Sequence, residues 1–487
     1  MQTDQSHPAA AREAVEPLFC SPAASRPTQK VHVVGVAGTG LRGMVNLLHQ
    51  RGLKITGSEL SESPVLDTFR GRGIDCRVGH AEGNVDRETS FVLISAAVND
   101  TNPEVREAMS LQIPVVKYAQ LLGHLMGEKQ GIAISGTHGK TTTTAMVALV
   151  LHEAGLEPTY LIGGEYPGLG GSSRWGEGPH FVAEACEFDR SFLNLQAKIS
   201  VVTNIEEDHL DYFESLKEIQ GAFAQFVSRL PRDGYLVVNR DDANSAYLSE
   251  FCCSQVGTFG LRPRFSDWWV EDITFEGGGS RFRIVGQNGE ESVARLRVPG
   301  LHNILNALAT TAVCRRVGLD LPRIVGILER FTGVRRRFDI LARGPVVVVD
   351  DYAHHPTEIR AVLRSARESL RGRRLIAVFQ PHQHSRLKHF REEFAAVLER
   401  FDTAIVTDVY RARDREEDAR TVRSDALVRA INDRKPQTPA IYAPSFQDAS
   451  ATLRAYVKDG DAILFLGAGN ITDLAKAYAR ELTATSE

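Results

Sequence analysis

The sequence lacks three features: a paired cysteine motif, a membrane-length apolar run and a strong excess of one charge. Its six cysteines are scattered, without a CxxC pair or metal-like spacing, so we expect reduced thiols in a cytoplasmic setting. No apolar run approaches the length that spans a bilayer, and membrane insertion is not expected. The formal net charge of −4 over 487 residues gives no reason to expect nucleic acid as a partner.

The first 29 residues differ from the rest of the chain. They are rich in Ala, Ser, Pro and acidic residues and lack the basic start and apolar core of a signal peptide, so we expect a disordered leader. The remaining residues suffice for about three domains of ordinary size. With 43% hydrophobic and 24% charged residues, the composition is that of a soluble globular protein.

Three blocks of the chain each begin with an apolar run typical of a buried strand. The runs are 31–34, 132–134 and 345–349, and a polar or glycine-rich turn follows each of them. Such runs, alternating with amphipathic stretches, predict an α/β protein with parallel sheets covered by helices. We expect three domains, at residues 30–127, 128–334 and 335–487, with a small antiparallel insertion over residues 259–298.

The most informative motif is Gly136-Thr137-His138-Gly139-Lys140-Thr141-Thr142, which lies between an apolar run and a helix-compatible stretch, Thr143 to Ala154. In this context, glycines let backbone N–H groups turn toward an anion, and the helix N-terminus adds partial positive charge. Lys140 can reach terminal phosphates, and the Thr141 hydroxyl is placed to ligate Mg²⁺. Ile134 stands where the usual P-loop has its first glycine, so an ordinary turn with a chance Gly-Lys-Thr is the alternative. We interpret the motif as an ATP or GTP site.

A second glycine-rich turn, at residues 35–40, follows the first apolar run. It is similar to a dinucleotide-binding fingerprint, although Ala37 interrupts the glycines. Glu59 ends the next apolar strand, about where an acidic residue would contact a ribose. From these residues alone, NAD, FAD, a nucleotide sugar and a purely structural turn all remain open.

Glu184 and His209 each follow a further apolar run of the central block. Glu184 comes directly after residues 181–183 and is the predicted second Mg²⁺ ligand, because this ion is usually held by one or two carboxylates plus phosphate oxygens. His209 follows the run at 199–202 and could bind a second metal or position phosphate. The alternatives are a solvated acidic turn and an ordinary surface histidine.

Polar clusters recur in the last half of the chain. Asn303 and Asn306 lie one helical turn apart and could read an adenine edge, although Asn303 as a helix cap is the alternative. Residues 350–358 and 379–386 place Asp, His and Arg side chains after two successive strands. Arg337, Arg386 and the histidines of these clusters could neutralise phosphate or carboxylate groups. Each cluster alone could be a solvated loop, and their repetition favours a binding site.

Taken in chain order, these motifs resemble those of the Mur ligases. The resemblance covers about residues 30–482 and rests on ten ordered signatures, at 35–43, 57–59, 136–142, 184–187, 203–209, 302–303, 336–339, 350–358, 381–382 and 467–470. It implies an N-terminal Rossmann-like domain that binds a UDP-sugar. It also implies a central P-loop ATPase-like domain with a mainly parallel sheet and a C-terminal Rossmann-like domain that binds an amino acid.

The resemblance further implies ATP-driven amide synthesis, with L-alanine, UDP-N-acetylmuramate, ATP and Mg²⁺ as the molecules bound. The lactyl carboxylate of the sugar nucleotide takes the γ-phosphoryl group of ATP, and the amine of L-alanine then attacks the acyl phosphate. A carboxylate is a poor electrophile until one of its oxygens belongs to a good leaving group, and two anions must be brought together. The protein is expected to act as a monomer or homodimer.

By the same resemblance, residues of this sequence take specific roles. The UDP-sugar is expected to contact Gly38, Thr39, Gly40, Ser58 and Glu59. ATP is expected to contact the loop from Gly136 to Thr142, together with His302, Asn303, Asn306 and Asp351. The expected amino-acid ligands are Tyr352, His382 and Arg386. The expected metal ligands are Thr141, Glu184 and His209. The expected catalytic residues are Lys140, His209, Arg337 and His355.

Three residues depart from the pattern of the family. Ala37 replaces a common glycine, Glu59 stands where Asp is common, and Gln383 stands where Arg is often found. The last departure leaves open a murein-tripeptide recycling ligase, with the same sugar nucleotide but a larger acceptor. A non-catalytic nucleotide-binding scaffold and, from the first block alone, a nicotinamide-dependent dehydrogenase are two competing hypotheses from different functional classes.

Overall fold

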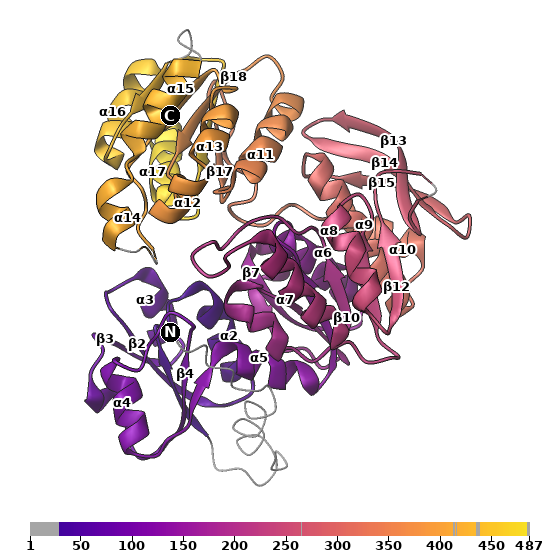
Figure 1. Ribbon diagram of the computed structural model, residues 1–487, viewed down its shortest axis with the longest axis vertical. Helices are drawn as coiled ribbons and strands as arrows, with labels where there is room; N and C mark the ends of the chain where they lie inside the picture. Colours follow the sequence, from indigo (N-terminus) through magenta and orange to yellow (C-terminus); the bar gives the residue numbers. More distant parts are fainter. Residues whose placement is uncertain (1–28, 264, 413, 415, 435–438, 485–487) are drawn as a thin grey trace. The chain divides into compact units, whose positions relative to one another are not determined.

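Figure 1 shows the computed structural model of the chain. The structure describes residues 29–484 except 264, 413, 415 and 435–438, so the expected disordered leader, apart from residue 29, lies outside the described residues. The described chain divides into two compact units. The first unit comprises the chain up to Ile205, Ile219–Phe259 and Ala312–Leu319. The second unit comprises Glu206–Glu218, Gly260–Thr311 and the chain from Asp320 onward.

The first unit begins with a five-stranded parallel sheet in the order β3-β2-β1-β4-β5. Its strands are β1 (Lys30–Val34), β2 (Lys54–Glu59), β3 (Asp75–Val78), β4 (Thr89–Ile94) and β5 (Val115–Lys117). Its helices are α2 (Thr39–Gln50), α3 (Pro64–Arg70), η2 (Glu82–Asn84), α4 (Pro103–Ser110) and α5 (Tyr118–Gly127). The strand order reverses at β1, so the turn after β1 lies at the switch point where such sheets bind ligands.

A second sheet of the first unit runs in the order β12-β11-β10-β6-β9-β7-β8, with only β8 antiparallel. Its strands are β6 (Gln130–Ser135), β7 (Thr159–Tyr166), β8 (Gly171–Arg174), β9 (His180–Glu184), β10 (Ala197–Val202), β11 (Tyr235–Asn239) and β12 (Gln255–Phe259). Its helices are α6 (Lys140–Glu153), η3 (Pro167–Leu169), η4 (Phe188–Asn194), α7 (Leu216–Ser228), α8 (Ala243–Tyr247) and η5 (Leu248–Phe251). Helix α6 is buried from Thr141 to Leu151, as expected for a helix enclosed on all sides.

The second unit contains the expected antiparallel insertion, made of β13 (Trp268–Glu276), β14 (Gly279–Gly286) and β15 (Glu291–Leu296). The turn between β13 and β14 has positive φ angles at Gly277 (60°) and Gly278 (81°). Two successive residues with positive φ match the twist of a hairpin and favour glycine, which explains the Gly277-Gly278 pair in this turn. Helices α9 (Leu301–Val317) and α10 (Leu321–Leu328) follow the insertion.

The C-terminal part of the second unit is a six-stranded sheet in the order β16-β17-β21-β18-β19-β20, parallel except for β16. Its strands are β16 (Asp339–Ala342), β17 (Val347–Asp351), β18 (Arg374–Phe379), β19 (Thr403–Val406), β20 (Ala440–Tyr442) and β21 (Asp461–Leu466). Its helices are α11 (Pro356–Ser369), α12 (His384–His389), α13 (Arg391–Leu398), α14 (Glu416–Thr421), α15 (Ser424–Arg434), α16 (Phe446–Tyr456) and α17 (Ile471–Ala484).

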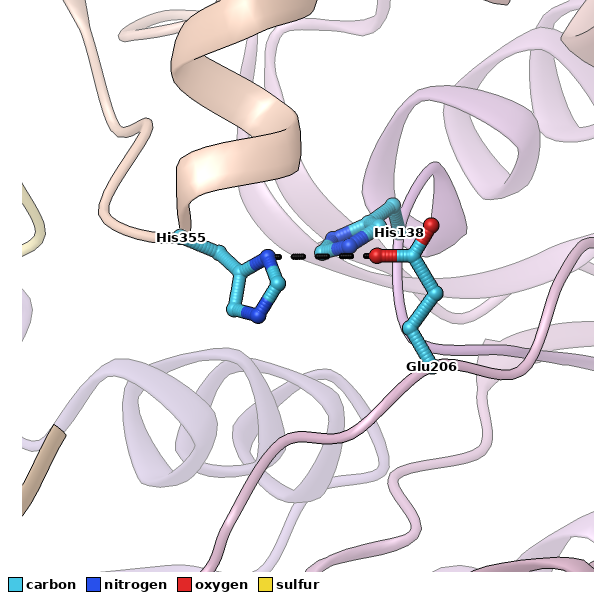
Figure 2. Close-up of side chains that lie close together, drawn as sticks. All are labelled: His138, Glu206 and His355. Carbon is cyan, nitrogen blue, oxygen red and sulfur yellow. Dashed lines mark ion pairs between the residues drawn. The ribbon is translucent and has the colours of Figure 1, made fainter. Parts of the chain in front are cut away.

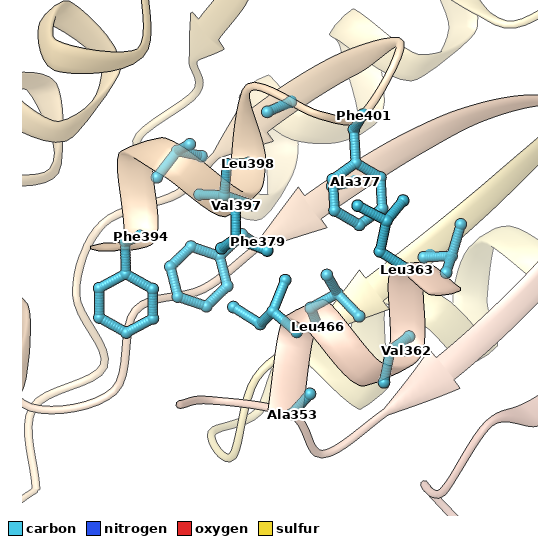
Figure 3. Packing of buried hydrophobic residues seen from close by; sticks show 14 of the residues in the cluster. Ala353, Val362, Leu363, Ala377, Phe379, Phe394, Val397, Leu398, Phe401 and Leu466 are labelled. Atoms are coloured by element: carbon cyan, nitrogen blue, oxygen red, sulfur yellow. The ribbon is translucent and has the colours of Figure 1, made fainter. Parts of the chain in front are cut away.

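Both faces of this six-stranded sheet are packed against helices. Val347 and Val349 belong to one buried cluster, whereas Val348 between them belongs to a cluster on the opposite face. Successive residues of a strand point to opposite faces, so a strand covered on both sides is apolar at consecutive positions, as at Val347–Val349. Figure 3 shows part of the first cluster, where Phe379 of β18 packs beside Phe394 of α13.

The mainly parallel α/β fold predicted from the apolar runs is therefore confirmed. Helix α6 begins three residues earlier than the predicted start at Thr143, because Gly139 adopts a left-handed conformation (φ 86°) and ends the loop there. No helix among the described residues is both long enough and apolar enough to cross a membrane.

Candidate functional site

The predicted phosphate loop, residues 136–142, connects β6 to α6 in the first unit. Gly136 and Gly139 have positive φ angles of 128° and 86°, which a residue with a side chain rarely adopts. A Cβ at Gly136 would lie 2.1 Å from the Thr203 hydroxyl oxygen, so that position also requires glycine for space. Thr141 and Thr142 lie in the first turn of α6 and are nearly buried. The loop thus ends at a helix N-terminus, where backbone N–H groups attract an anion.

The residues that follow β10 hold the phosphate loop in shape. The backbone N–H groups of Thr137 and His138 donate to the backbone oxygen and the side-chain Oδ1 of Asn204, both at 2.9 Å. The Asn204 side-chain Nδ2 donates back to the His138 carbonyl at 3.1 Å. Because β10 pairs with β6 in parallel, the segment after one strand supports the loop after the other.

Lys140 is tied to the acidic turn that follows β9. Its Nζ donates to both carboxylate oxygens of Glu187, at 3.0 and 3.1 Å, and to the Thr137 carbonyl at 3.1 Å. Burial alone would lower the pKa of Lys140, but the nearby Glu187 carboxylate raises it above its usual value. Lys140 is therefore charged at neutral pH, and it lies at the loop where phosphate would bind.

Glu184, the predicted magnesium ligand, lies at the end of β9 beside the phosphate loop. In the parallel pairing of β6 and β9, Glu184 is opposite Ile134, two residues before the loop begins. A Cβ at Gly163 would lie 2.5 Å from Glu184 Oε1, so the glycine makes room for the carboxylate, and its backbone N–H donates to that oxygen. A carboxylate and the Thr141 hydroxyl are hard oxygen donors of the kind Mg²⁺ prefers, and this donor set fits the ion.

The glycine-rich turn after β1 is held by the end of β2. The backbone N–H groups of Gly35 and Val36 donate to the Ser58 carbonyl at 2.9 and 3.0 Å, and Ala37 N–H donates to Glu59 Oε2 at 3.1 Å. Gly38 is at the cap position of α2, which begins at Thr39. The Ser58 side chain is fully buried and its hydroxyl points to Glu104, so the surface that this residue offers to a ligand is limited.

A cavity of about 190 Å³ lies within the first unit, between the turn after β1 and the end of β9. Gly40 and Tyr118 line one part of it, and Glu184 and Cys186 line another. A Cβ at Gly40 would lie 3.5 Å from the Tyr118 ring. The remaining lining is mostly apolar and includes Leu122, Leu161, Ile162, Phe192 and Leu195. One cavity thus brings together a predicted UDP-sugar residue and the predicted magnesium ligand.

The predicted adenine residues lie in the first two turns of α9, in the second unit. Asn303 Nδ2 donates to the Pro299 carbonyl at 2.7 Å, and Asn306 Nδ2 donates to Asn303 Oδ1 at 3.3 Å. The alternative prediction, that Asn303 caps the helix, is wrong, because α9 begins at Leu301 and the side chain donates rather than accepts. His302, beside them, is exposed.

Asp351 ends β17 and organises the segment before β16. Its two carboxylate oxygens accept from the backbone N–H groups of Phe338 and Ala353, both at 2.7 Å. Burial raises the pKa of Asp351 to about 6, partly offset by the Arg337 guanidinium. The guanidinium of Arg337 lies 5.0 Å from the centre of the Tyr352 ring. The structure therefore brings three predicted residues, Arg337, Asp351 and Tyr352, together.

His355, a predicted catalytic residue, caps helix α11. Its Nδ1 accepts from the Thr357 backbone N–H at 3.3 Å, while Glu358 Oε2 accepts from the His355 N–H at 3.2 Å. Figure 2 shows that His355 also faces Glu206, with 3.9 Å between Nδ1 and Oε2. The capping interaction fixes the ring at the start of the helix.

Arg386 and His382 lie together in the second unit. Arg386 Nη1 donates to the His382 carbonyl at 3.1 Å, and Nη2 donates to Asp208 Oδ1 at 2.7 Å. Burial alone would raise the pKa of Asp208, but the Arg386 cation holds it well below its usual value. Asp208 Oδ1 also accepts from the backbone N–H of His209, at 2.7 Å. One carboxylate thus links the predicted metal ligand His209 to the predicted amino-acid ligand Arg386.

Gln383, which departs from the family pattern, is buried. It adopts a left-handed conformation (φ 69°), is 1% exposed, and its backbone N–H donates to the Tyr410 carbonyl at 3.0 Å. The ring of His382, one residue earlier, stacks on Tyr410 with 5.5 Å between the ring centres.

Sequence reasoning missed the partners of three predicted residues. Glu187 is the partner of Lys140, and Asp208 is the partner of Arg386. Both carboxylates lie inside predicted motifs, but a carboxylate in an acidic cluster cannot be assigned to one cation from spacing alone. Glu104, the partner of Ser58, had no signal in the sequence.

Sequence models of three domains of one family match this chain. The Mur ligase catalytic domain matches residues 30–130, the Mur ligase middle domain matches 134–314, and the Mur ligase glutamate ligase domain matches 336–469. The chain belongs to the Mur ligase family, as its motifs predicted.

Within this family, the chain is similar to proteins named UDP-N-acetylmuramate–L-alanine ligase. It is 38% identical over 456 residues to the one from Desulforamulus reducens and 39% identical over 455 residues to the one from Sulfurihydrogenibium sp., which covers 93% of this chain and 98% of the relative in both cases. The crystal structure of UDP-N-acetylmuramate–alanine ligase from Thermotoga maritima covers 94% of this chain and 99% of its own, with a TM-score of 0.80 and 28% identity. A murein peptide ligase from Psychrobacter arcticus shares the fold, with a TM-score of 0.71 at 22% identity, and covers 93% of this chain and 98% of its own.

Proposed function

We propose that this chain ligates L-alanine to UDP-N-acetylmuramate at the expense of ATP, giving UDP-N-acetylmuramoyl-L-alanine, ADP and phosphate. This reaction supplies a precursor of peptidoglycan. The observation that carries the proposal is the cavity that is bordered by Gly40 on one side and by Glu184 on the other. Glu184 lies beside the phosphate loop, so a sugar nucleotide at the first turn could present its carboxylate to the terminal phosphate of ATP.

Lys140 supplies the positive charge that this encounter requires. Two anions, the lactyl carboxylate and the triphosphate, repel each other, and a preorganised cation lowers that cost most where water is excluded. In this role, Lys140 exchanges the Glu187 carboxylate, 3.0 Å from its Nζ, for the phosphate oxygens. Mg²⁺, which Thr141 and Glu184 would hold, supplies further positive charge when it is bound, and His209 is assigned to a second Mg²⁺.

In the second unit, the proposed roles follow the chemistry of each side chain. Arg337 carries a permanent positive charge suited to the transferred phosphoryl group. Asp351 accepts hydrogen bonds and is assigned to the ribose of ATP, with Asn303 and Asn306 at its adenine. Tyr352, His382 and Arg386 are assigned to the amino acid, whose carboxylate a guanidinium can bind through two parallel hydrogen bonds.

Phosphate release by the purified protein tests the proposal. The assay contains ATP, Mg²⁺ and UDP-N-acetylmuramate, with L-alanine, glycine, L-serine or the murein tripeptide as acceptor. We expect phosphate release to depend on both the sugar nucleotide and the acceptor, with L-alanine the preferred acceptor. A preference for the tripeptide would replace the proposal by the recycling ligase, and release that no acceptor stimulates would refute ligation altogether.

A further inference from the structure

The first parallel sheet contains a buried carboxylate that the proposed chemistry does not use. Glu104 lies in the first turn of α4 and is 0% exposed. Its Oε2 accepts from the Ser58 hydroxyl at 2.7 Å and contacts His80 Nδ1 at 3.0 Å. Its Oε1 accepts from Asn84 Nδ2 and lies 3.4 Å from His32 Nε2. Polar groups from β1, β2, η2 and the loop after β3 thus converge on one carboxylate.

This network keeps Glu104 ionised. Burial by itself would raise the pKa of its carboxyl, but hydrogen bonds from His32, Ser58 and Asn84 lower the pKa below its usual value. A buried ion pair seldom stabilises a fold more than apolar residues of the same volume would. The stability of the fold alone therefore does not explain why an ionised Glu104 is buried here. A role in positioning one of its hydrogen-bond partners does explain it.

The hydrogen-bond partners of Ser58 and His80 show where the hydrogens of this network lie. The Ser58 hydroxyl has one hydrogen and gives it to Glu104, so it must accept at its contact with His80 Nδ1, which is 3.0 Å long. The hydrogen is therefore on Nδ1 of His80, shared between Ser58 and Glu104. In a neutral imidazole the other nitrogen, Nε2, is then an acceptor. The His80 side chain remains 16% exposed, whereas those of His32 and Glu104 are 1% and 0% exposed.

The position of His80 in the sheet is that expected for a nucleobase contact. The strand order is β3-β2-β1. In doubly wound sheets the pyrophosphate lies at the turn after the first strand and the ribose lies near the acidic residue that ends the second. These are the turn at 35–40 and Glu59. His80 follows β3, and the neighbouring Gly79 N–H donates to the Glu59 carbonyl at 2.8 Å. A nucleotide laid from β1 across β2 would place its base over β3.

We propose that Glu104 is a positioning residue that holds His80 in the tautomer whose Nε2 accepts a hydrogen bond from the N3–H of uracil. This inference rests on the proposed function, because it assigns the base of the UDP-sugar. Cytosine has no hydrogen on N3, so the same Nε2 would face a lone pair. The pair Glu104 and His80 therefore selects a uridine nucleotide over a cytidine nucleotide.

Titration calorimetry of the full chain with UDP and with CDP tests the inference. The wild-type protein should bind UDP at least about 10-fold more tightly than CDP, because one mismatched buried hydrogen bond costs about that factor. His80→Ala should reduce the ratio to about threefold or less. Glu104→Gln, which changes charge but not size, should reduce the ratio while leaving the KM for ATP unchanged. Glu82→Gln, the same change at an exposed position of η2, is the matched control and should keep the wild-type ratio.

A role limited to folding would not change a ratio between two ligands. The inference is overturned if the wild-type protein does not discriminate, or if His80→Ala keeps the wild-type ratio. The inference is equally overturned if Glu104→Gln keeps the wild-type ratio while circular dichroism shows that the variant is folded. Should Glu104→Gln fail to fold, His80→Ala decides alone. Discrimination without acceptor-dependent phosphate release would sustain this inference while refuting the proposed function. Ligation together with unchanged discrimination in His80→Ala would refute this inference alone.

Discussion

Replacing Lys140 by methionine separates two consequences of one side chain. The substitution keeps most of the apolar stem and removes the charge. Activity should fall because the phosphate loop loses its cation. Stability should also fall, because Glu187 is 2% exposed and its carboxylate loses the charge that lies 3.0 Å away.

The contacts set the size of each effect. Removing one partner of a buried ion pair costs about 3–5 kcal/mol. The Lys140 side chain is 15% exposed, so water reaches part of the pair and we take the lower end, about 3 kcal/mol. For a domain of roughly 200 residues, that amounts to a fall of about 6–12 °C in the midpoint of thermal unfolding. Acceptor-dependent phosphate release should fall about 1,000-fold, the size seen when a preorganised charge-stabilising group is lost.

A double substitution distinguishes the two effects. Lys140→Met combined with Glu187→Gln should recover most of the lost stability, because no buried charge is left, but none of the activity. Glu187→Gln alone should keep turnover within about 10-fold of wild type, since Lys140 remains. Differential scanning fluorimetry and a phosphate-release assay measure both quantities. Normal turnover in Lys140→Met would refute the role of the lysine, and a double variant no more stable than the single one would refute the electrostatic account.

Three further predictions concern other residues of the site. Glu184→Gln should raise the Mg²⁺ concentration needed for half-maximal activity about 10-fold, because a neutral amide replaces an ionised ligand. Because the pKa of Asp351 is raised to about 6, the folded protein holds this proton more tightly than the unfolded chain does. The stability that Asp351 contributes is thus greatest at low pH and is lost as pH rises through 6, so wild type should lose about 1 kcal/mol relative to Asp351→Asn between pH 5 and 7. Arg386→Ala should raise the KM for L-alanine at least about 10-fold and destabilise the fold, because Asp208 keeps a buried charge without this cation; adding Asp208→Asn should recover stability but not KM.

Matched measurements control these three experiments. Glu177→Gln, at an exposed position before β9, should leave the magnesium titration unchanged, and an unchanged titration in Glu184→Gln as well would count against the ligand. Urea unfolding at both pH values measures the second effect; parallel pH profiles for wild type and Asp351→Asn would contradict it. Equal KM values for wild type and Arg386→Ala would remove Arg386 from the amino-acid site.

The local sequence was enough to predict the α/β fold and the strand, loop and helix around residues 136–142. A strand, a glycine-bearing turn and a helix are local features, and the positive φ angles of Gly136 and Gly139 are requirements that a sequence displays directly. Continuous runs of Val, Ile and Leu likewise indicate strands of a sheet that is covered on both faces. Helix starts are predicted less well, as the earlier beginning of α6 illustrates, because the sequence does not show which residue of the loop is the last before the helix.

Pairings between distant residues were decided by the tertiary structure alone. Lys140 meets Glu187, 47 residues later, because β9 lies next to β6, although β7 and β8 intervene in the chain. Glu104 collects its partners from β1, β2 and η2 in the same way. The order of the strands in a sheet determines which of the loops after the strands are neighbours. That order depends on how the crossover connections and their helices pack, and it cannot be inferred from the loop sequences. Composition and spacing therefore indicate which side chains are candidates for binding and catalysis, whereas the fold determines which carboxylate pairs with which cation.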